Sequence, residues 1–131
     1  MFTEFNNNFY IKEYENNLAK KYGLLESIMY YDLYKIYWSF YDLRNNPNCS
    51  DLLILDDNYW YILPLSDLYM QYNYKYIHDI TIKKALQNLI QQKLVIEYKG
   101  NKKKQYFKEL GLTYLQQRNI KLIRFKNRNE E

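Results

Sequence analysis

Residues that mark disulfide-bonded, metal-binding, phosphate-binding and membrane proteins are scarce in this 131-residue sequence. It contains a single cysteine, Cys49, which excludes an intrachain disulfide bond and a metal site built from several thiolates. Its three glycines are too few for a glycine-rich phosphate-binding loop. The longest aliphatic run, Leu52 to Leu55, is far shorter than the roughly 20 apolar residues of a membrane helix. We therefore expect no metal, no cofactor and no membrane partner.

The groups needed for catalysis or secretion are equally sparse. The only histidine, His78, has no thiol or serine motif beside it, and the acid pair Asp56-Asp57 is better explained as a turn. We expect His78 to cap a helix and the protein not to be an enzyme. Residues 1–10 contain Glu4 and three consecutive asparagines, where a secretory signal needs a basic start and then an apolar stretch. These features predict a cytoplasmic protein.

The sequence does contain enough apolar residues for one domain, and its charge is unevenly distributed. Hydrophobic residues make up 47% of the chain, which predicts a single domain with its own core over residues 1–131. The net charge is only +4, but residues 75–108 hold nine lysines against two acids, whereas residues 1–74 are acidic. Positive charge gathered in one part of a chain is typical of a surface that meets a polyanion.

A long helix is predicted over residues 18–43, preceded by an N-terminal arm at residues 1–17. Apolar residues such as Leu25, Leu33 and Phe40 recur at helical spacing, and the opposite side of the helix is aromatic. A helix that is apolar nearly all round is buried on two sides. Either it forms the centre of the monomer, or its aromatic face packs against a second chain. For the second case we predict a homodimer whose interface contains Tyr30, Tyr34, Trp38, Tyr41, Tyr114 and Leu122.

Short elements are predicted between the long helix and the basic region. The apolar island Leu52 to Leu55 is either part of a loop or an extra strand. The run Asn58 to Leu63, rich in Tyr, Trp and Ile, predicts a strand. Ser66 is the predicted N-cap of a short helix. Together with the helix that follows, this short helix predicts a helix-turn-helix unit over residues 64–93.

The second helix of that unit is the most informative element, with an amphipathic pattern over residues 80–91. Its buried face is predicted to contain Ile82, Ala85, Leu86 and Leu89. The second helix of a helix-turn-helix enters the major groove and presents its N-terminal residues to base edges. The predicted DNA-facing residues are Ile80, Thr81, Lys83, Lys84, Gln87 and Asn88. Among them Thr81, Lys84 and Asn88 are the candidates for base contacts, because Asn pairs well with adenine and Lys with guanine.

A basic hairpin, or wing, is predicted over residues 94–108. The strand-like runs Leu94 to Tyr98 and Gln105 to Lys108 flank a tip in which Gly100 suits a tight connection. Four lysines around the tip repel one another unless a counter-charge is near, and a phosphate backbone would supply it. The tip is therefore either a solvated loop or a DNA-contacting surface. Its predicted contacts are Lys99, Asn101, Lys102, Lys103 and Lys104, and these lysines, with Lys83, are expected to bind phosphates.

The order of these elements resembles winged-helix regulators and the replication or segregation proteins of plasmids and phages. Three segments are similar to that family: Ile77 to Leu89 as recognition helix, Leu94 to Phe107 as wing, and Glu109 to Leu115 as the start of a post-wing helix. His78 and Lys93 depart from the family, which usually has Ser or Thr and Gly at these positions. The resemblance implies an α+β, mainly helical fold that binds double-stranded DNA as a homodimer, in transcription, replication or segregation.

The C-terminal segment and the partner each leave alternatives open. Residues 109–131 form either a final helix and tail, or a helix stopped at Asn119 and followed by an extended segment from Ile120 to Phe125. An alternative function is a protein-interaction module, such as a phage-encoded inhibitor or adaptor, because tyrosine and tryptophan dominate binding hot spots. The aromatic residues available for it are Tyr30, Tyr34, Trp38, Tyr69, Tyr72, Tyr74 and Tyr76. RNA binding is a weaker third option, since the sequence contains no RNA-module signature.

Overall fold

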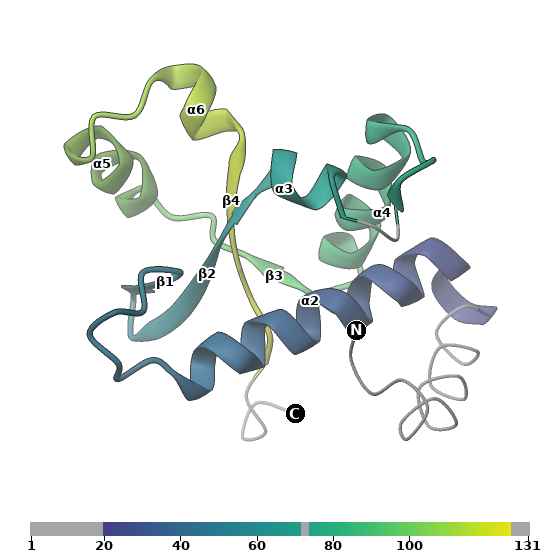
Figure 1. Ribbon diagram of the computed structural model, residues 1–131, viewed down its shortest axis with the longest axis horizontal. Helices are drawn as coiled ribbons and strands as arrows, with labels where there is room; N and C mark the ends of the chain where they lie inside the picture. The colour runs from purple at the N-terminus through teal and green to yellow at the C-terminus, as the bar shows by residue number, and fades with distance from the viewer. Residues whose placement is uncertain (1–19, 72–73, 127–131) are drawn as a thin grey trace.

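Helices surround a small antiparallel sheet in the computed structural model of the protein, which describes residues 20–71 and 74–126 (Figure 1). The predicted α+β class, with more helix than strand, is confirmed. Within the described ranges, no helix is both long enough and apolar enough to cross a bilayer. In chain order the elements are α2 (Leu24–Asp42), β1 (Leu52–Leu55), β2 (Asn58–Pro64), α3 (Leu65–Tyr69), α4 (Asp79–Gln91), β3 (Ile96–Glu97), α5 (Lys102–Glu109), α6 (Tyr114–Arg118) and β4 (Ile120–Arg124).

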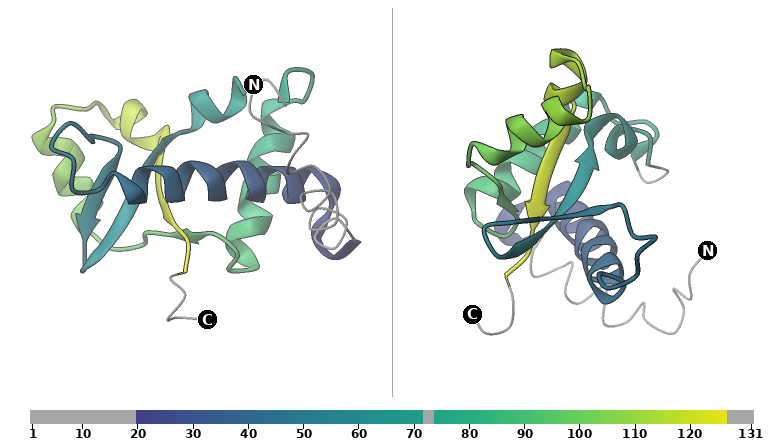
Figure 2. Two further views of the ribbon diagram at one scale, coloured as in Figure 1. Left: turned by 60° about the horizontal axis from the view of Figure 1, so that its bottom comes forward. Right: turned by 90° about the vertical axis from the view of Figure 1, so that its left-hand side faces the viewer.

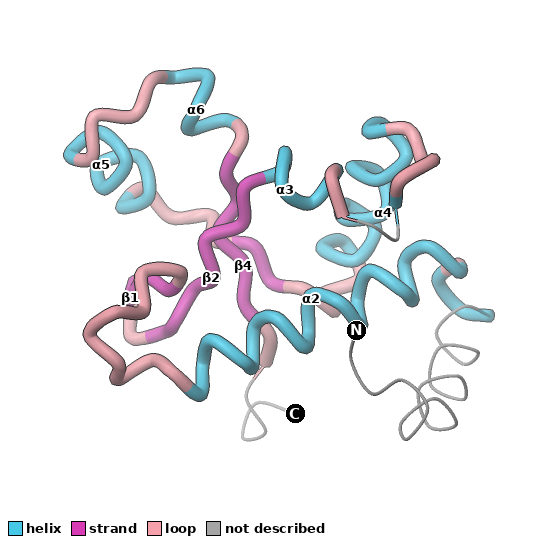
Figure 3. Tube along the Cα trace, in the orientation of Figure 1, coloured by secondary structure: helices cyan, strands magenta, loops and turns pink. Residues whose placement is uncertain are grey.

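The sheet has the strand order β1-β2-β4-β3, so the last strand of the chain lies between two earlier ones (Figure 3). All three pairs are antiparallel: Tyr61 of β2 lies opposite Ile123 of β4, and Ile96 of β3 lies opposite Arg124. The strand before α3 and the strand after α4 are thus joined only through β4. This arrangement makes the sheet depend on contacts between residues far apart in the sequence.

The acid pair Asp56-Asp57 is a turn, as the sequence predicts. It connects β1 to β2, and its φ angles of 53° and 64° are the left-handed values that both central residues of a tight hairpin turn need. Aspartate tolerates this conformation better than most residues do. The apolar island Leu52–Leu55 is therefore an extra strand and not part of a loop.

Two helices begin at residues other than those predicted. Residues 20–22 are helical, as predicted, but Gly23 has φ 113° and ψ 153°, which no helical residue adopts, so it interrupts the helix and α2 begins at Leu24. Residues 18 and 19 lie outside the described part of the chain. The short helix α3 begins at Leu65, so Ser66 lies inside it, and the extended residue Pro64 occupies the N-cap position. Proline suits a helix start because it lacks the N–H that would be unsatisfied there.

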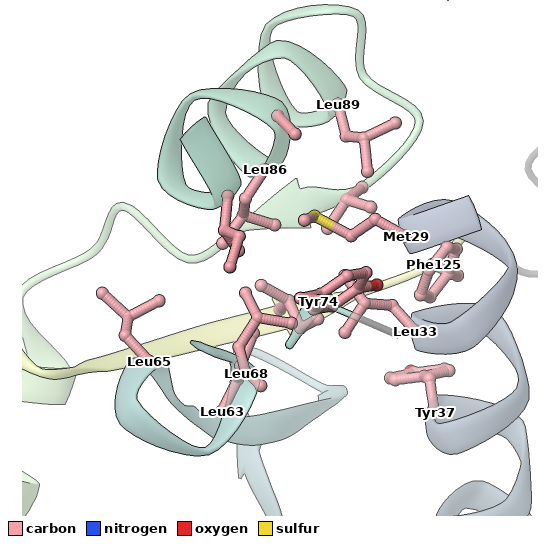
Figure 4. Packing of buried hydrophobic residues seen from close by; sticks show 14 residues of the cluster. Met29, Leu33, Tyr37, Leu63, Leu65, Leu68, Tyr74, Leu86, Leu89 and Phe125 are labelled. Atoms are coloured by element: carbon pink, nitrogen blue, oxygen red, sulfur yellow. The ribbon is translucent and has the colours of Figure 1, made fainter. Parts of the chain in front are cut away.

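The main core lies between α2, α3, α4 and one face of the sheet (Figure 4). Met29 and Leu33 of α2 meet Leu86 and Leu89 of α4, and all four are at most 1% exposed. The aromatic side of α2 is covered by the same chain, because Phe125 lies against the rings of Tyr30, Tyr34 and Tyr37, with centroids 5.4–5.6 Å apart. Two explanations were considered for a helix that is apolar nearly all round. Burial at the centre of the monomer explains most of the aromatic face of α2.

A second, smaller core fills the opposite face of the sheet. It contains Trp60, Tyr98, Phe107 and Leu122. Leu122 and Ile123 are adjacent in β4 and both fully buried, because successive side chains of a strand point to opposite faces. The two cores therefore meet at β4, and α5 covers the face of the sheet that α2 and α4 leave open.

The predicted wing is wrong in its second half, since residues 102–109 form the helix α5 and not a strand. β3 is only two residues long, and its partner is β4, not Gln105 to Lys108. Lysine, glutamine and glutamate are good helix formers, and the Gln105 amide bonds to Glu109 one turn later. Helix formation also turns Phe107 onto the sheet, where its ring is 1% exposed.

The C-terminal region adopts the second predicted alternative, in which a helix stops at Asn119 and an extended segment follows. The helix predicted from residue 109 is limited to α6, which begins at a capping box formed by Thr113 and Gln116. Asn119 ends it, and Ile120–Arg124 forms β4. A helix could not replace this strand, because two consecutive residues are buried on opposite sides of one layer. Residues 127–131 of the predicted tail, like residues 1–17 of the predicted arm, lie outside the described residues.

Candidate nucleic-acid interface

Helix α4 brings the predicted recognition residues together on one exposed face. Its apolar residues Ile82, Ala85, Leu86 and Leu89 are at most 2% exposed, as the sequence predicts. Because these residues anchor one side of the helix, the other side must face solvent. The residues that are exposed there are Ile80, Thr81, Lys83, Lys84, Gln87 and Asn88.

The start of α4 carries a negative charge but lacks a side-chain cap. His78 occupies the N-cap position with extended backbone angles, yet its side chain makes no capping hydrogen bond. The negative charge of Asp79 in the first turn interacts favourably with the helix dipole. The connection from α3 spans residues 70–78, which is longer than the three- or four-residue turn common in helix-turn-helix units. It is anchored by Tyr74, whose buried hydroxyl donates a hydrogen bond to Asp32 Oδ2 at 3.0 Å.

The end of α4 has a geometry that normally calls for glycine. Lys93 follows the C-cap residue Gln92 and has a φ of 61°. The Lys93 N–H bonds to Ile90 O and the Leu94 N–H to Leu89 O, each at 3.0 Å, which together form a Schellman motif. Lysine therefore occupies a left-handed position at which glycine would be unstrained.

Part of the exposed face of α4 already makes a contact within the chain. Asn88 Nδ2 donates a hydrogen bond to Glu26 Oε2 of α2 at 2.8 Å. The Asn88 amide keeps a second N–H and its Oδ1 for a base, but the Glu26 carboxylate beside it repels phosphate groups nearby. Thr81, Lys83 and Lys84 lie one to two turns closer to the helix start, away from this contact.

Three of the four lysines predicted at the wing tip have partners within the chain. Lys99 and Lys102 form ion pairs with Glu97 at 2.8 Å and Asp56 at 2.5 Å, and Lys103 Nζ donates to the carbonyl of Ile120 at 2.9 Å. The counter-charge that the sequence analysis expected from phosphate is thus partly supplied by two carboxylates. Lys104 is exposed.

The pKa values of the two carboxylates agree with these contacts. The hydrogen bond from Lys102 lowers the pKa of Asp56. Burial alone would raise the pKa of Glu97, but the hydrogen bonds from Lys99 and Lys121 outweigh it and lower that pKa. Both acids are therefore held ionised in the folded protein at neutral pH.

Helix α5 lies far from α4. Figures 1 and 2 show α4 at one end of the molecule and α5 with α6 at the other, with the strands between them. The predicted wing lysines are therefore not next to the face of α4. Any surface that joins the two groups has to extend over the whole length of the sheet.

A basic hollow between α5 and α6 was missed by the sequence analysis. Its volume is about 300 Å³. The signal was present as helical spacing, with Lys103 and Phe107 four residues apart, and Tyr114 and Arg118 likewise. Because residues 105–108 were predicted to form a strand, this helical spacing was not recognised. The lining residues are Gly100, Asn101, Lys103, Lys104, Phe107, Tyr114, Gln117 and Arg118.

The predicted dimer interface does not form one surface. Leu122 is fully buried inside the monomer, so it cannot contact a second chain. Tyr30, Trp38 and Tyr41 are half-buried against the main core, whereas Tyr34 and Tyr114 are 44% and 69% exposed. These last two belong to α2 and α6. Among the aromatic residues predicted for a protein partner, Tyr74 is also buried, Tyr69 is half-buried, Tyr76 is exposed, and Tyr72 lies outside the described residues.

Comparison with known proteins adds no relative to this description. No protein-family model, no curated protein and no solved structure matches the sequence. In residues 20–71 and 74–126, no three His, Cys, Asp or Glu side chains are grouped so that they could hold a metal ion. The face of α4 and the hollow between α5 and α6 are therefore the two sites whose chemistry we develop.

Proposed function

We propose that the protein binds double-stranded DNA by placing α4 in the major groove. The observation that carries this proposal is the division of α4 into a buried apolar face and an exposed face of lysine, threonine and amide side chains. Such a helix is supported from behind and presents hydrogen-bond donors at a width that the major groove admits. The exposed lysines of α4 supply attraction for phosphates.

The arrangement around α4 supports a winged-helix type of domain. A strand precedes α3, a strand follows α4, and β4 pairs with both of them. The family to which the sequence is similar usually has glycine before its wing strand, and Lys93 has the left-handed backbone of such a glycine here. In this proposal the connection between β3 and β4, which holds α5 and α6, takes the place of the hairpin wing.

The proposed contacts fall mainly on the first half of α4. Thr81 and Lys84 contact base edges, and Lys83 contacts a phosphate. Ile80, which is 64% exposed, lies against a thymine methyl group. Asn88 contributes through the N–H and the Oδ1 that its hydrogen bond to Glu26 leaves unused. The lysines of α5 lie at the other end of the molecule and are not part of this contact.

The proposal is tested by titrating the protein with a pool of random duplexes at two salt concentrations. We expect affinity to fall steeply as salt rises, and Lys83→Gln to lower the slope by about one, because Lys83 is the lysine of α4 that contacts a phosphate. Lys108→Gln is the matched control, since it removes an exposed charge on α5, far from α4. Salt-insensitive binding, no binding at low salt, or an equal effect of the control would overturn the proposal.

A regulator, replication or segregation role on a palindromic site would need a homodimer, which we retain as part of the proposal. Two copies of α4 would then meet two half-sites one helical turn apart. Sedimentation of the protein with and without a palindromic duplex tests this point. A monomer bound singly at every concentration would remove the dimer but leave DNA binding by α4 intact.

A second candidate function is binding to another protein through the connection between α3 and α4. Met70, Tyr76 and Ile80 are close in the sequence and are 82%, 91% and 64% exposed, and large exposed apolar groups are typical of interaction surfaces when they form one patch. Changing Met70 and Tyr76 to Ser separates the two functions, because neither residue belongs to the face of α4 that is proposed to contact DNA. Loss of a protein partner with unchanged duplex affinity would favour the second function, and loss of duplex affinity would favour the first.

A further inference from the structure

The hollow between α5 and α6 combines a buried ring, an exposed ring and three cations. Phe107 forms its floor and is 1% exposed, while Tyr114 lines one side and is 69% exposed. Lys103, Lys104 and Arg118 supply the positive charge, and none of the lining residues is acidic. The volume of about 300 Å³ is at the lower end of the range known for small-molecule sites, roughly 300–1,000 Å³. It fits one small ligand and not a helix or a duplex.

Positive charge at this site exceeds what the protein itself neutralises. The Lys103 ammonium group has three donor hydrogens, and the Ile120 carbonyl accepts one of them. Burial lowers the pKa of Lys103, and the neighbouring charges of Lys99 and Lys121 lower it further, against the effect of Glu97. An anion in the hollow would therefore relieve an unfavourable interaction that exists in the unliganded protein.

The two α6 residues are arranged for a planar ligand that carries a phosphate. The guanidinium carbon of Arg118 lies 5.7 Å from the ring centroid of Tyr114, and both side chains are exposed on one turn of helix. A guanidinium group binds two phosphate oxygens at once, and a tyrosine ring stacks on a nucleobase. In every nucleotide a single sugar joins the base to the phosphate. The neighbouring side chains of Tyr114 and Arg118 can therefore bind the base and the phosphate of one ligand together.

We propose that the hollow between α5 and α6 binds a free mononucleotide, with its phosphate on Lys103, Lys104 and Arg118 and its base on Tyr114. Stacking on an aromatic ring tolerates any base, so the site selects the phosphate and a flat ring more than one particular base. The site is separate from the face of α4. Its occupation neither requires nor follows from duplex binding.

The test is calorimetric titration of the full chain with AMP, GMP, CMP and UMP, beside adenosine and inorganic phosphate. We expect saturable binding of the nucleotides with a dissociation constant on the order of 1 mM or tighter. Adenosine and inorganic phosphate should each bind about tenfold more weakly, because each lacks one half of the contacts.

Matched variants locate the binding. Tyr114→Ala and Arg118→Gln should each weaken nucleotide binding about tenfold, and both change exposed residues, so the fold should survive. Lys108→Gln and Tyr76→Ala remove an exposed charge and an exposed ring outside the hollow and should leave the affinity unchanged. Far-ultraviolet circular dichroism of each variant checks the fold.

Four results would overturn the proposal. Absence of saturable binding by all four nucleotides would do so, as would inorganic phosphate binding as tightly as AMP, because the ring contact would then be absent. Equal weakening by the Lys108 control would show a diffuse effect of charge. Binding of a single-stranded oligonucleotide without any binding of mononucleotides would assign the hollow to nucleic-acid strands. Failure of duplex binding by α4 would leave the nucleotide site unaffected.

Discussion

Glu97 accepts a hydrogen bond from Lys121 at 2.9 Å, and the two side chains are only 12% and 17% exposed. This ion pair joins β3 to β4, the two strands from which the connection containing α5 and α6 begins and ends. β3 has only two residues, so its backbone hydrogen bonds alone hold it weakly. Side-chain pairing across the strands therefore fixes the place where the second half of the molecule attaches to the first.

Removing the charge of Glu97 should destabilise the protein. Glu97→Gln leaves Lys121 largely buried without its counter-ion, and we expect a loss of about 1–3 kcal/mol in the free energy of unfolding. Urea unfolding followed by tryptophan fluorescence measures this, since Trp60 lies in the adjacent core. Glu109→Gln, at an exposed site on α5, should cost less than about 0.5 kcal/mol. Equal stability of Glu97→Gln and the unchanged protein would contradict the role of the pair.

The same carboxylate predicts how stability depends on pH. Because the folded pKa of Glu97 is lowered, its contribution is fully present above the unfolded value near 4.5 and is lost as pH falls through the folded pKa. Stability should therefore decline below about pH 4.5, and more gradually in Glu97→Gln than in the unchanged protein. Urea midpoints measured from neutral pH down to pH 3 provide the comparison. Parallel curves would show that Glu97 has no part in the decline.

Local patterns predict the elements whose neighbours are close in sequence. The buried face of α4 follows from its own periodicity, and the Asp56-Asp57 turn follows from the two residues that form it. α5 was not found in this way, because its two adjacent aromatic residues favour a strand and compete with the helical spacing of Lys103 and Phe107. What fixes it is the sheet face under Phe107, and that face exists only after β4 has inserted between β2 and β3. The partners of Lys102 and Lys103 also come from segments that are distant in sequence, since Asp56 is 46 residues from Lys102 and Ile120 is 17 residues from Lys103.

The helical form of residues 102–109 has a direct test in Phe107. Its ring is 1% exposed in the second core, so Phe107→Ala should destabilise the protein by about 3–5 kcal/mol. In an exposed hairpin wing the same change would cost little. Leu115→Ala is the control, because that side chain is 75% exposed and should contribute less than about 0.5 kcal/mol. A small effect of Phe107→Ala would favour the hairpin.

Lys93→Gly should stabilise the protein although it removes a side chain. Lysine at φ 61° is strained, and in the Schellman motif at the end of α4 glycine is the usual residue. The gain should be about 0.5–1 kcal/mol, because relief of strain exceeds the extra freedom of glycine in the unfolded chain. Thermal unfolding measures it. Gln92→Gly, at a neighbouring residue with φ −80°, should be destabilising instead, and equal shifts for both variants would refute the explanation.

Base contacts and phosphate contacts on α4 should be separable once a preferred duplex has been selected. Lys84→Gln should cost about 1–3 kcal/mol on that duplex and little on an unrelated one, because a base contact is lost only where the right base is present. Lys83→Gln should weaken binding to both duplexes equally and lower the salt slope by about one, since every duplex carries the same phosphates. The two lysines are adjacent and carry the same charge, so any difference between them arises from their direction on the helix. Identical losses for both variants on both duplexes would mean that α4 contacts only the DNA backbone.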